Sequence, residues 1–84
     1  MTDPTTIDRK SQIRDFIVTK LLNGRAVGDD ENLLLSGLID SLGVFELIAF
    51  LEKSFGLTIP LDEVVLENFT SIDTIDAYVA TKQA

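Results

Sequence analysis

Ser41 directly follows Asp40, and this Asp-Ser pair is the first place to look for a chemical role. A serine nucleophile needs a positioned base, usually a histidine, and the chain has no histidine and no cysteine. The hydrolase pattern G-x-S-x-G also fails, because Ile39 stands where its first glycine belongs. We therefore expect no catalytic residue, and a small hydrolase that uses Ser41 is the least favoured interpretation.

A bound metal is also disfavoured by the residue types. Histidine and cysteine are the commonest ligands of zinc, and the chain has neither. A calcium loop beginning at Asp29 would need a ligand and a glycine at its fifth and sixth positions, which are Leu33 and Leu34. We expect no metal site.

What remains for Ser41 is to be modified. A phosphate ester on its hydroxyl would lie at the N-terminus of a helix, where free N–H groups and the helix dipole favour an anion. The site suits a phosphodiester better than it suits a reaction.

Length and charge narrow the class of protein. The 84 residues fit one domain, 1–84, in which residues 1–5 form a flexible lead. The net charge of −7 argues against binding to nucleic acid. Residues 1–25 hold three acids and five bases, whereas residues 26–84 hold eleven acids and two bases, so a docking surface for basic partners belongs to the later part. No signal peptide or membrane-spanning stretch is present, and we expect a cytoplasmic monomer without membrane insertion.

The first part of the chain predicts a helix and a long connection. Apolar residues three and four apart predict an amphipathic helix over about residues 6–22, which Asn23-Gly24 ends. The connection over 23–40 is long for a compact domain, and its leucines predict an ordered crossing with one short helical turn.

The later part predicts three further helices. Asp40 is a favoured N-cap for a helix that runs to about Phe55, before Gly56. A short helical piece is expected at 62–67, and Thr70 or Ser71 caps a last helix, in which Tyr78 is half-buried with its hydroxyl in water. The fold class is all-α, a four-helix bundle of three main helices and one short helix with a long first loop.

The helix that follows Asp40 carries more apolar surface than a core requires. At 100° per residue, one stripe faces the core, and it comprises Val44, Leu47, Ile48, Leu51 and Phe55. Leu42, Phe45 and Ala49 lie on the opposite side. Either the long loop covers this second strip, or a partner protein docks on it. Phe50, Leu51 and Phe55 crowd the inward side of this helix, which leaves little room for a void there.

The run GLIDSLGVFELIAFLEKSFGLTIP, residues 37–60, resembles the acyl carrier and peptidyl carrier proteins. The resemblance covers about residues 7–80 and rests on the D-S-L triplet, the order of elements and an I-P that ends nineteen residues beyond Ser41. It implies a bundle of acyl-carrier type in which Ser41, flanked by Asp40 and Leu42, receives 4′-phosphopantetheine from coenzyme A. The resemblance implies that the arm then holds an acyl or aminoacyl group as a thioester. The crowding by Phe50, Leu51 and Phe55 favours a short group over a long sequestered chain.

The resemblance also implies partners and a docking surface. The partners are a phosphopantetheinyl transferase, a ligase or synthetase that loads the cargo, and a downstream acyltransferase or synthase. The docking residues it implies are Leu42, Phe45, Glu46, Ala49, Glu52, Asp62 and Glu63.

This chain departs from fatty-acid-synthesis carriers in its second helix. Those carriers have a strongly acidic helix here, whereas Ser41 to Phe55 holds only Glu46, Glu52 and Lys53 as charged residues. The departure favours a specialised pathway, such as polyketide synthesis, nonribosomal peptide synthesis, or D-alanyl or aminoacyl transfer. The alternative is an unmodified helical interaction module that uses the Leu42-Phe45-Ala49 strip as an adaptor surface.

Overall fold

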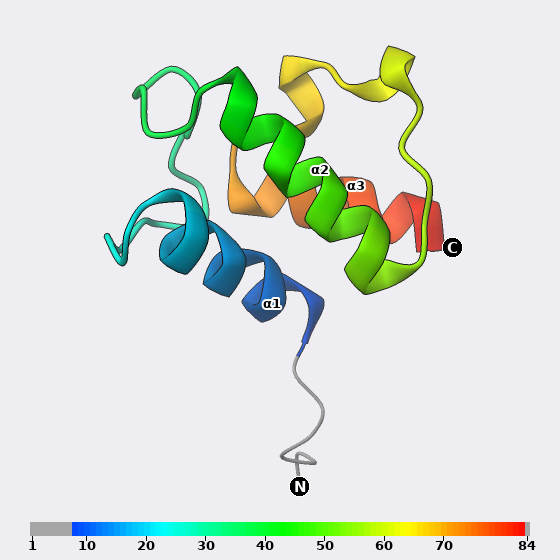
Figure 1. Ribbon diagram of the computed structural model, residues 1–84, viewed down its shortest axis with the longest axis horizontal. Helices are drawn as coiled ribbons and strands as arrows, with labels where there is room; N and C mark the ends of the chain where they lie inside the picture. Colours follow the sequence, from blue (N-terminus) through cyan, green and yellow to red (C-terminus); the bar gives the residue numbers. More distant parts are fainter. Residues whose placement is uncertain (1–7, 84) are drawn as a thin grey trace, which may run out of the picture.

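The computed structural model describes residues 8–83, and within them it holds three α-helices and no strand. In chain order the elements are α1 (Arg9–Phe16), a π-helical turn η1 (Ile17–Leu21), α2 (Ser41–Phe55), two 3-10 turns, η2 (Leu61–Glu63) and η3 (Leu66–Asn68), and α3 (Ile72–Gln83) (Figure 1). The all-α class with a long first loop is confirmed. In the part of the chain that the structure describes, no helix has the length and apolar character needed to cross a membrane.

The first helix begins later than the hydrophobic pattern predicts. Asp8 has an extended backbone and its carboxylate accepts the Ser11 N–H at 2.7 Å, so the helix begins at Arg9. The predicted start at residues 6 and 7, and the predicted lead over 1–5, lie outside the described residues. The helix ends as predicted, because Asn23 and Gly24 both adopt positive φ angles, of 54° and 88°.

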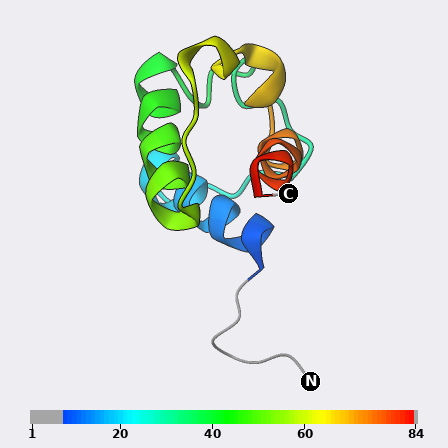
Figure 2. The same cartoon turned by 90° about the vertical axis from the view of Figure 1, so that its right-hand side faces the viewer.

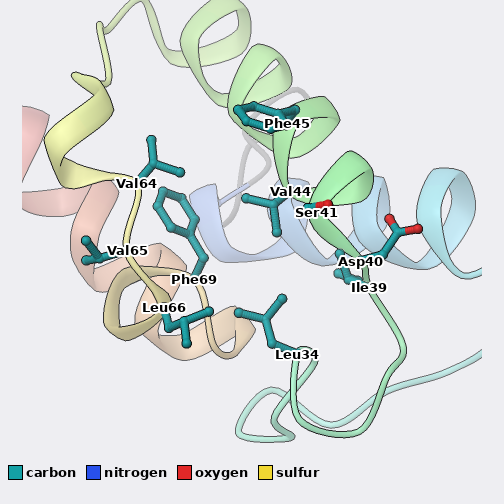
Figure 3. A pocket seen from close by; sticks show the side chains of 10 residues that line it. All are labelled: Leu34, Ile39, Asp40, Ser41, Val44, Phe45, Val64, Val65, Leu66 and Phe69. Atoms are coloured by element: carbon teal, nitrogen blue, oxygen red, sulfur yellow. The ribbon is translucent and has the colours of Figure 1, made fainter.

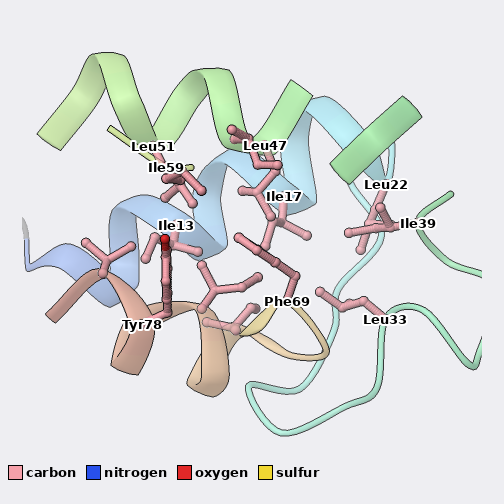
Figure 4. Close-up of a cluster of buried hydrophobic side chains, with 14 residues drawn as sticks. Ile13, Ile17, Leu22, Leu33, Ile39, Leu47, Leu51, Ile59, Phe69 and Tyr78 are labelled. Atoms are coloured by element: carbon pink, nitrogen blue, oxygen red, sulfur yellow. The ribbon is translucent and has the colours of Figure 1, made fainter. Parts of the chain in front are cut away.

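The core lies where the three helices meet. Figure 4 shows its side chains converging from α1, α2, α3 and the connecting segments. The fully buried members are Ile13, Ile17, Leu33, Leu47, Leu51, Ile72, Ile75 and Val79. The predicted inward stripe of α2 is confirmed at Leu47, Ile48 and Leu51, while Val44 and Phe55 are only partly buried. Phe50 stacks on Phe16 of α1 with ring centroids 4.2 Å apart.

Ion pairs fasten the basic first helix to acids from the later part of the chain. They join Arg9 to Asp76 at 2.6 Å, Lys10 to Asp73 at 2.8 Å, and Arg14 to both carboxylate oxygens of Asp29 at 2.8 and 2.7 Å. The uneven charge distribution along the sequence is thus partly neutralised within the molecule.

The long first loop is an ordered crossing, as predicted, and Leu33 anchors it. Leu33 is fully buried, its N–H donates to the Thr70 carbonyl at 2.7 Å, and its own carbonyl accepts from Leu38 and Ile39. Leu35, in contrast, is 87% exposed. Only some of the leucines therefore fix the loop.

The predicted short helix at 62–67 is replaced by two separate 3-10 turns. Val64 and Val65 lie between them, and Val65 is fully extended, with φ −124° and ψ 155°, which breaks the helical run. Figure 2 shows this segment closing the molecule between α2 and α3. The last helix is capped by Ser71, whose Oγ accepts the Thr74 N–H at 3.2 Å while Thr74 Oγ1 accepts the Ser71 N–H at 2.9 Å.

Candidate functional site

The first turn of α2 is held by Asp40, which is its N-cap as predicted. Its backbone is extended, and its carboxylate oxygen Oδ1 accepts the Gly43 N–H at 2.9 Å. Its carbonyl accepts the Val44 N–H at 3.0 Å, the first bond of the helical ladder. Asp40 thereby fixes where α2 begins and which way Ser41 faces.

Ser41 is the first residue of α2 and is exposed. Because the cap carboxylate takes the N–H of Gly43, the N–H groups of Ser41 and Leu42 have no hydrogen-bond partner among residues 8–83. These two donors lie at the positive end of the helix dipole. An anion attached to the Ser41 hydroxyl would meet them.

Gly43 allows the chain before the site to pack tightly under α2. A Cβ atom at this position would stand 2.7 Å from Cγ2 of Ile39, closer than such atoms approach in proteins. Ile39 is buried in the core and immediately precedes Asp40. The glycine therefore lets Ile39 anchor the entry to the helix beside the cap.

An apolar cavity of about 240 Å³ opens beside Ser41. In Figure 3, Val44 of α2 faces Val64 and Phe69 of the opposite segment across it, while the Asp40 carboxylate points away. The lining residues are Leu34, Ile39, Asp40, Ser41, Val44, Phe45, Val64, Val65, Leu66 and Phe69. The crowding expected from Phe50, Leu51 and Phe55 lies elsewhere on α2, because none of the three lines this cavity.

The apolar strip of α2 lies in solvent. Leu42 is 67% exposed, Phe45 is 57% exposed and Ala49 is exposed as well, so the long loop does not cover them. Two exposed residues of the opposite cavity wall, Val65 and Leu66, extend this surface. We call these five residues the apolar rim. The sequence analysis missed Val65 and Leu66, although the repeated apolar letters in LDEVVLEN, residues 61–68, were a signal.

The four acids predicted for docking fall into two groups. Glu46 and Asp62 are exposed. The other two are engaged within the chain: Glu52 accepts the Ile59 N–H at 2.9 Å, and Glu63 accepts from the Tyr78 hydroxyl at 2.5 Å and from Lys82 Nζ at 2.7 Å.

The contact with Glu63 corrects the expectation for Tyr78. The tyrosine is buried and its hydroxyl donates to a carboxylate rather than to water. Burial, followed by this hydrogen bond, raises the pKa of Tyr78 well above its usual value. Lys82 and then Tyr78 lower the pKa of Glu63, so the carboxylate is ionised at neutral pH.

Comparison with known proteins bears on this site. The family model described as "Phosphopantetheine attachment site" matches residues 11–79. A D-alanyl carrier protein of Streptococcus suis (strain 98HAH33) is 33% identical over 69 residues, which are 82% of this chain and 87% of that protein. The D-alanyl carrier protein of Streptococcus mutans serotype c is 30% identical over the same shares. That of Streptococcus uberis is 39% identical over 46 residues, 55% of this chain and 58% of that protein.

Proposed function

The chain belongs to the family of carrier proteins with a phosphopantetheine attachment site, and we propose that the Ser41 hydroxyl is the attachment point. The observation that carries the proposal is the position of Ser41, exposed at the start of α2 behind the cap residue Asp40. The D-S-L triplet of the resembled family falls on Asp40, Ser41 and Leu42, inside the matched range.

The residues around Ser41 fit a phosphodiester. The free N–H groups of Ser41 and Leu42 supply donors for its negative charge, and the helix dipole adds to them. The Asp40 carboxylate is held by Gly43, so its charge is turned from the hydroxyl. The exposure of Ser41 leaves the hydroxyl within reach of a separate transferase.

The role of the chain is to hold and present its cargo rather than to react. When bound, 4′-phosphopantetheine supplies the thiol that forms the thioester. The chain has no cysteine, so no protein thiol competes for that thioester. Tethering raises the effective concentration of the cargo at each partner enzyme, while weak docking permits exchange between partners.

The cargo we propose is an aminoacyl group, specifically D-alanyl. The similar streptococcal proteins are named D-alanyl carrier proteins, and the weakly acidic α2 also favours a specialised carrier. The partners would then be a phosphopantetheinyl transferase, a ligase that activates the amino acid, and a downstream acyltransferase. Loading of this single-domain monomer would take place in the cytoplasm.

The partners would dock on the apolar rim. Phe45, Val65 and Leu66 line the cavity together with Ser41, and Leu42 and Ala49 continue the exposed surface along α2. Glu46 and Asp62 are exposed acids that can attract a basic partner surface. Glu52 and Glu63 are left out of the proposed surface, because their carboxylates bind groups of this chain.

Mass measurement tests the attachment point. The protein is incubated with coenzyme A, Mg²⁺ and a broad-specificity phosphopantetheinyl transferase, and its intact mass is recorded. We expect one adduct in the wild type and in Ser54→Ala, an exposed serine of the same helix, and none in Ser41→Ala. If several transferases leave the wild type unmodified, the unmodified interaction module becomes the better explanation.

Loading with competing substrates tests the cargo. The modified protein is offered D-alanine, L-alanine and octanoate, each with ATP and an activating enzyme of matching specificity. We expect a hydroxylamine-sensitive adduct with D-alanine at the highest rate. Acceptance of the octanoyl group alone would refute the aminoacyl assignment and leave Ser41 as the attachment point.

A further inference from the structure

One wall of the cavity beside Ser41 is formed by a segment with little burial of its own. Within Leu61–Asn68, the two 3-10 turns contain no buried residue, and Leu61, Val65 and Leu66 are exposed. Burial of Ile59 and Phe69 fixes the two flanks of the segment. Among the apolar residues of this wall, Val64 alone packs against the core, and it is only partly buried, so polar contacts must help to position the wall.

Glu63 supplies those contacts. One carboxylate oxygen accepts from the Tyr78 hydroxyl at 2.5 Å and pairs with Lys82 Nζ at 2.7 Å, which ties η2 to α3. The backbone carbonyl of the same residue accepts from Asn68 Nδ2 at 2.8 Å, which ties η2 to η3. One residue thus joins both turns to each other and to the last helix.

Tyr78, which donates to the Glu63 carboxylate, is connected to the cavity through the core. The ring of Tyr78 contacts that of Phe69, with centroids 5.5 Å apart, and Phe69 lines the cavity opposite Val44. Lys82 Nζ lies 5.9 Å from the centre of the Tyr78 ring. Tyr78 is itself buried, so the acceptor on Glu63 is held against a rigid part of the molecule.

We propose that Glu63 is a positioning residue, which holds the Leu61–Asn68 wall beside Ser41 and so sets the shape of the apolar rim that partner enzymes meet. This inference rests on the proposed function in that it assigns the wall to docking. Hydrogen bonds to a charged group are stronger than neutral ones, so loss of the Glu63 carboxylate opens the wall locally, although the backbone bond to Asn68 and the packing of Val64 remain.

Amide hydrogen exchange on the unmodified protein tests the first half of the proposal. The reporters are the N–H groups of Val64, Asn68 and Phe69, which donate within the two turns. In Glu63→Ala we expect their exchange to rise about tenfold, with a smaller rise in Glu63→Gln, which keeps an acceptor for Tyr78. The control is Glu67→Gln, an exposed acid of the same segment that loses the same charge. Amides of Leu47 and Leu51 report on the stability of α2.

Kinetics with the phosphopantetheinyl transferase test the second half. We expect Glu63→Ala to raise KM several-fold with kcat unchanged, and Glu67→Gln to leave KM close to the wild-type value. Exchange equal to that of Glu67→Gln would overturn the proposal. An equal rise at Leu47 and Leu51 would also overturn it, because Glu63 would then be a general stabiliser. A selective rise with unchanged KM would also overturn it. The exchange result does not depend on Ser41, so failure of this proposal and failure of the attachment proposal remain distinguishable.

Discussion

The α1–α3 side of the molecule and the cavity side are held together in different ways. Between α1 and α3, isoleucines with no exposed surface are flanked by two ion pairs, Arg9 to Asp76 and Lys10 to Asp73. Around the cavity, Phe45, Val65 and Leu66 lie in solvent, and two short turns take the place of the expected helix (Figure 2). The first region buries its apolar side chains, and the second exposes apolar surface on which we propose that partner proteins dock.

Truncation of a core isoleucine should have the largest effect on stability. Ile75 has no exposed surface, so Ile75→Ala should lower the free energy of unfolding by about 2–5 kcal/mol through lost burial and a residual cavity. Urea denaturation at neutral pH measures this change. A loss as small as that of an exposed site would show that the α1–α3 side is not the main source of stability.

Gly43→Ala tests the junction between the two regions. Overpacking against Ile39 should cost about 1–3 kcal/mol, partly offset by about 1 kcal/mol from the higher helix propensity of alanine. The net loss should also slow modification of Ser41, because the entry to α2 shifts. In the double variant Ile39→Ala/Gly43→Ala the clash is absent, so the two changes should cost less together than the sum of the single losses. Additive losses would contradict the tight contact.

Acid should weaken the α1 side through Asp29. Hydrogen bonds from Arg14 hold the pKa of this carboxyl below its ordinary value of 3.8. A carboxyl group whose pKa is lowered in the folded state stabilises that state fully at pH values above its ordinary pKa. This stabilisation is lost as the pH falls through the lowered pKa. The urea concentration at the midpoint of unfolding should therefore decrease as the pH drops below about 4. The decrease should be less steep in Asp29→Asn than in Asp30→Asn, which changes the exposed neighbour. Equal slopes would rule out a contribution from the pair.

Phe45→Ala should have the smallest effect on stability and a clear effect on docking. The side chain is 57% exposed, so the free energy of unfolding should change by no more than about 0.5 kcal/mol. The KM of a transferase or ligase should rise, because the ring belongs to the apolar rim. Ser54→Ala, also exposed on α2, is the matched control for KM. A large stability loss with unchanged KM would place Phe45 with the core instead.

Features fixed by neighbouring residues could be predicted from the sequence. Asp40 caps α2 through its own i+3 amide, and Gly56 ends the helix with a φ of 63°, so both ends follow from local chemistry. The left-handed Asn23 and Gly24 were predictable for the same reason. Ser41 could be singled out as the proposed attachment point because its neighbours in sequence are also its neighbours in space.

Features fixed by distant contacts could not be predicted in the same way. The 3-10 turns depend on Glu63 meeting Tyr78, fifteen residues later, and neither residue alone indicates that contact. The cavity lies between Val44 of α2 and Phe69, which is distant in sequence. The periodicity of α2 indicates only which face of that helix turns inward. The start of the first helix shifted because the Asp8 cap overrode the hydrophobic pattern.

The hydrogen bond between Tyr78 and Glu63 also equips the molecule with an intrinsic optical reporter. The chain has one tyrosine and no tryptophan, so its near-ultraviolet fluorescence comes from that single ring. A carboxylate that accepts a hydrogen bond from the tyrosine hydroxyl alters the fluorescence yield of the ring, and separation of the two groups restores that yield. A movement of the cavity wall away from α3 would therefore change the emission of the unlabelled carrier.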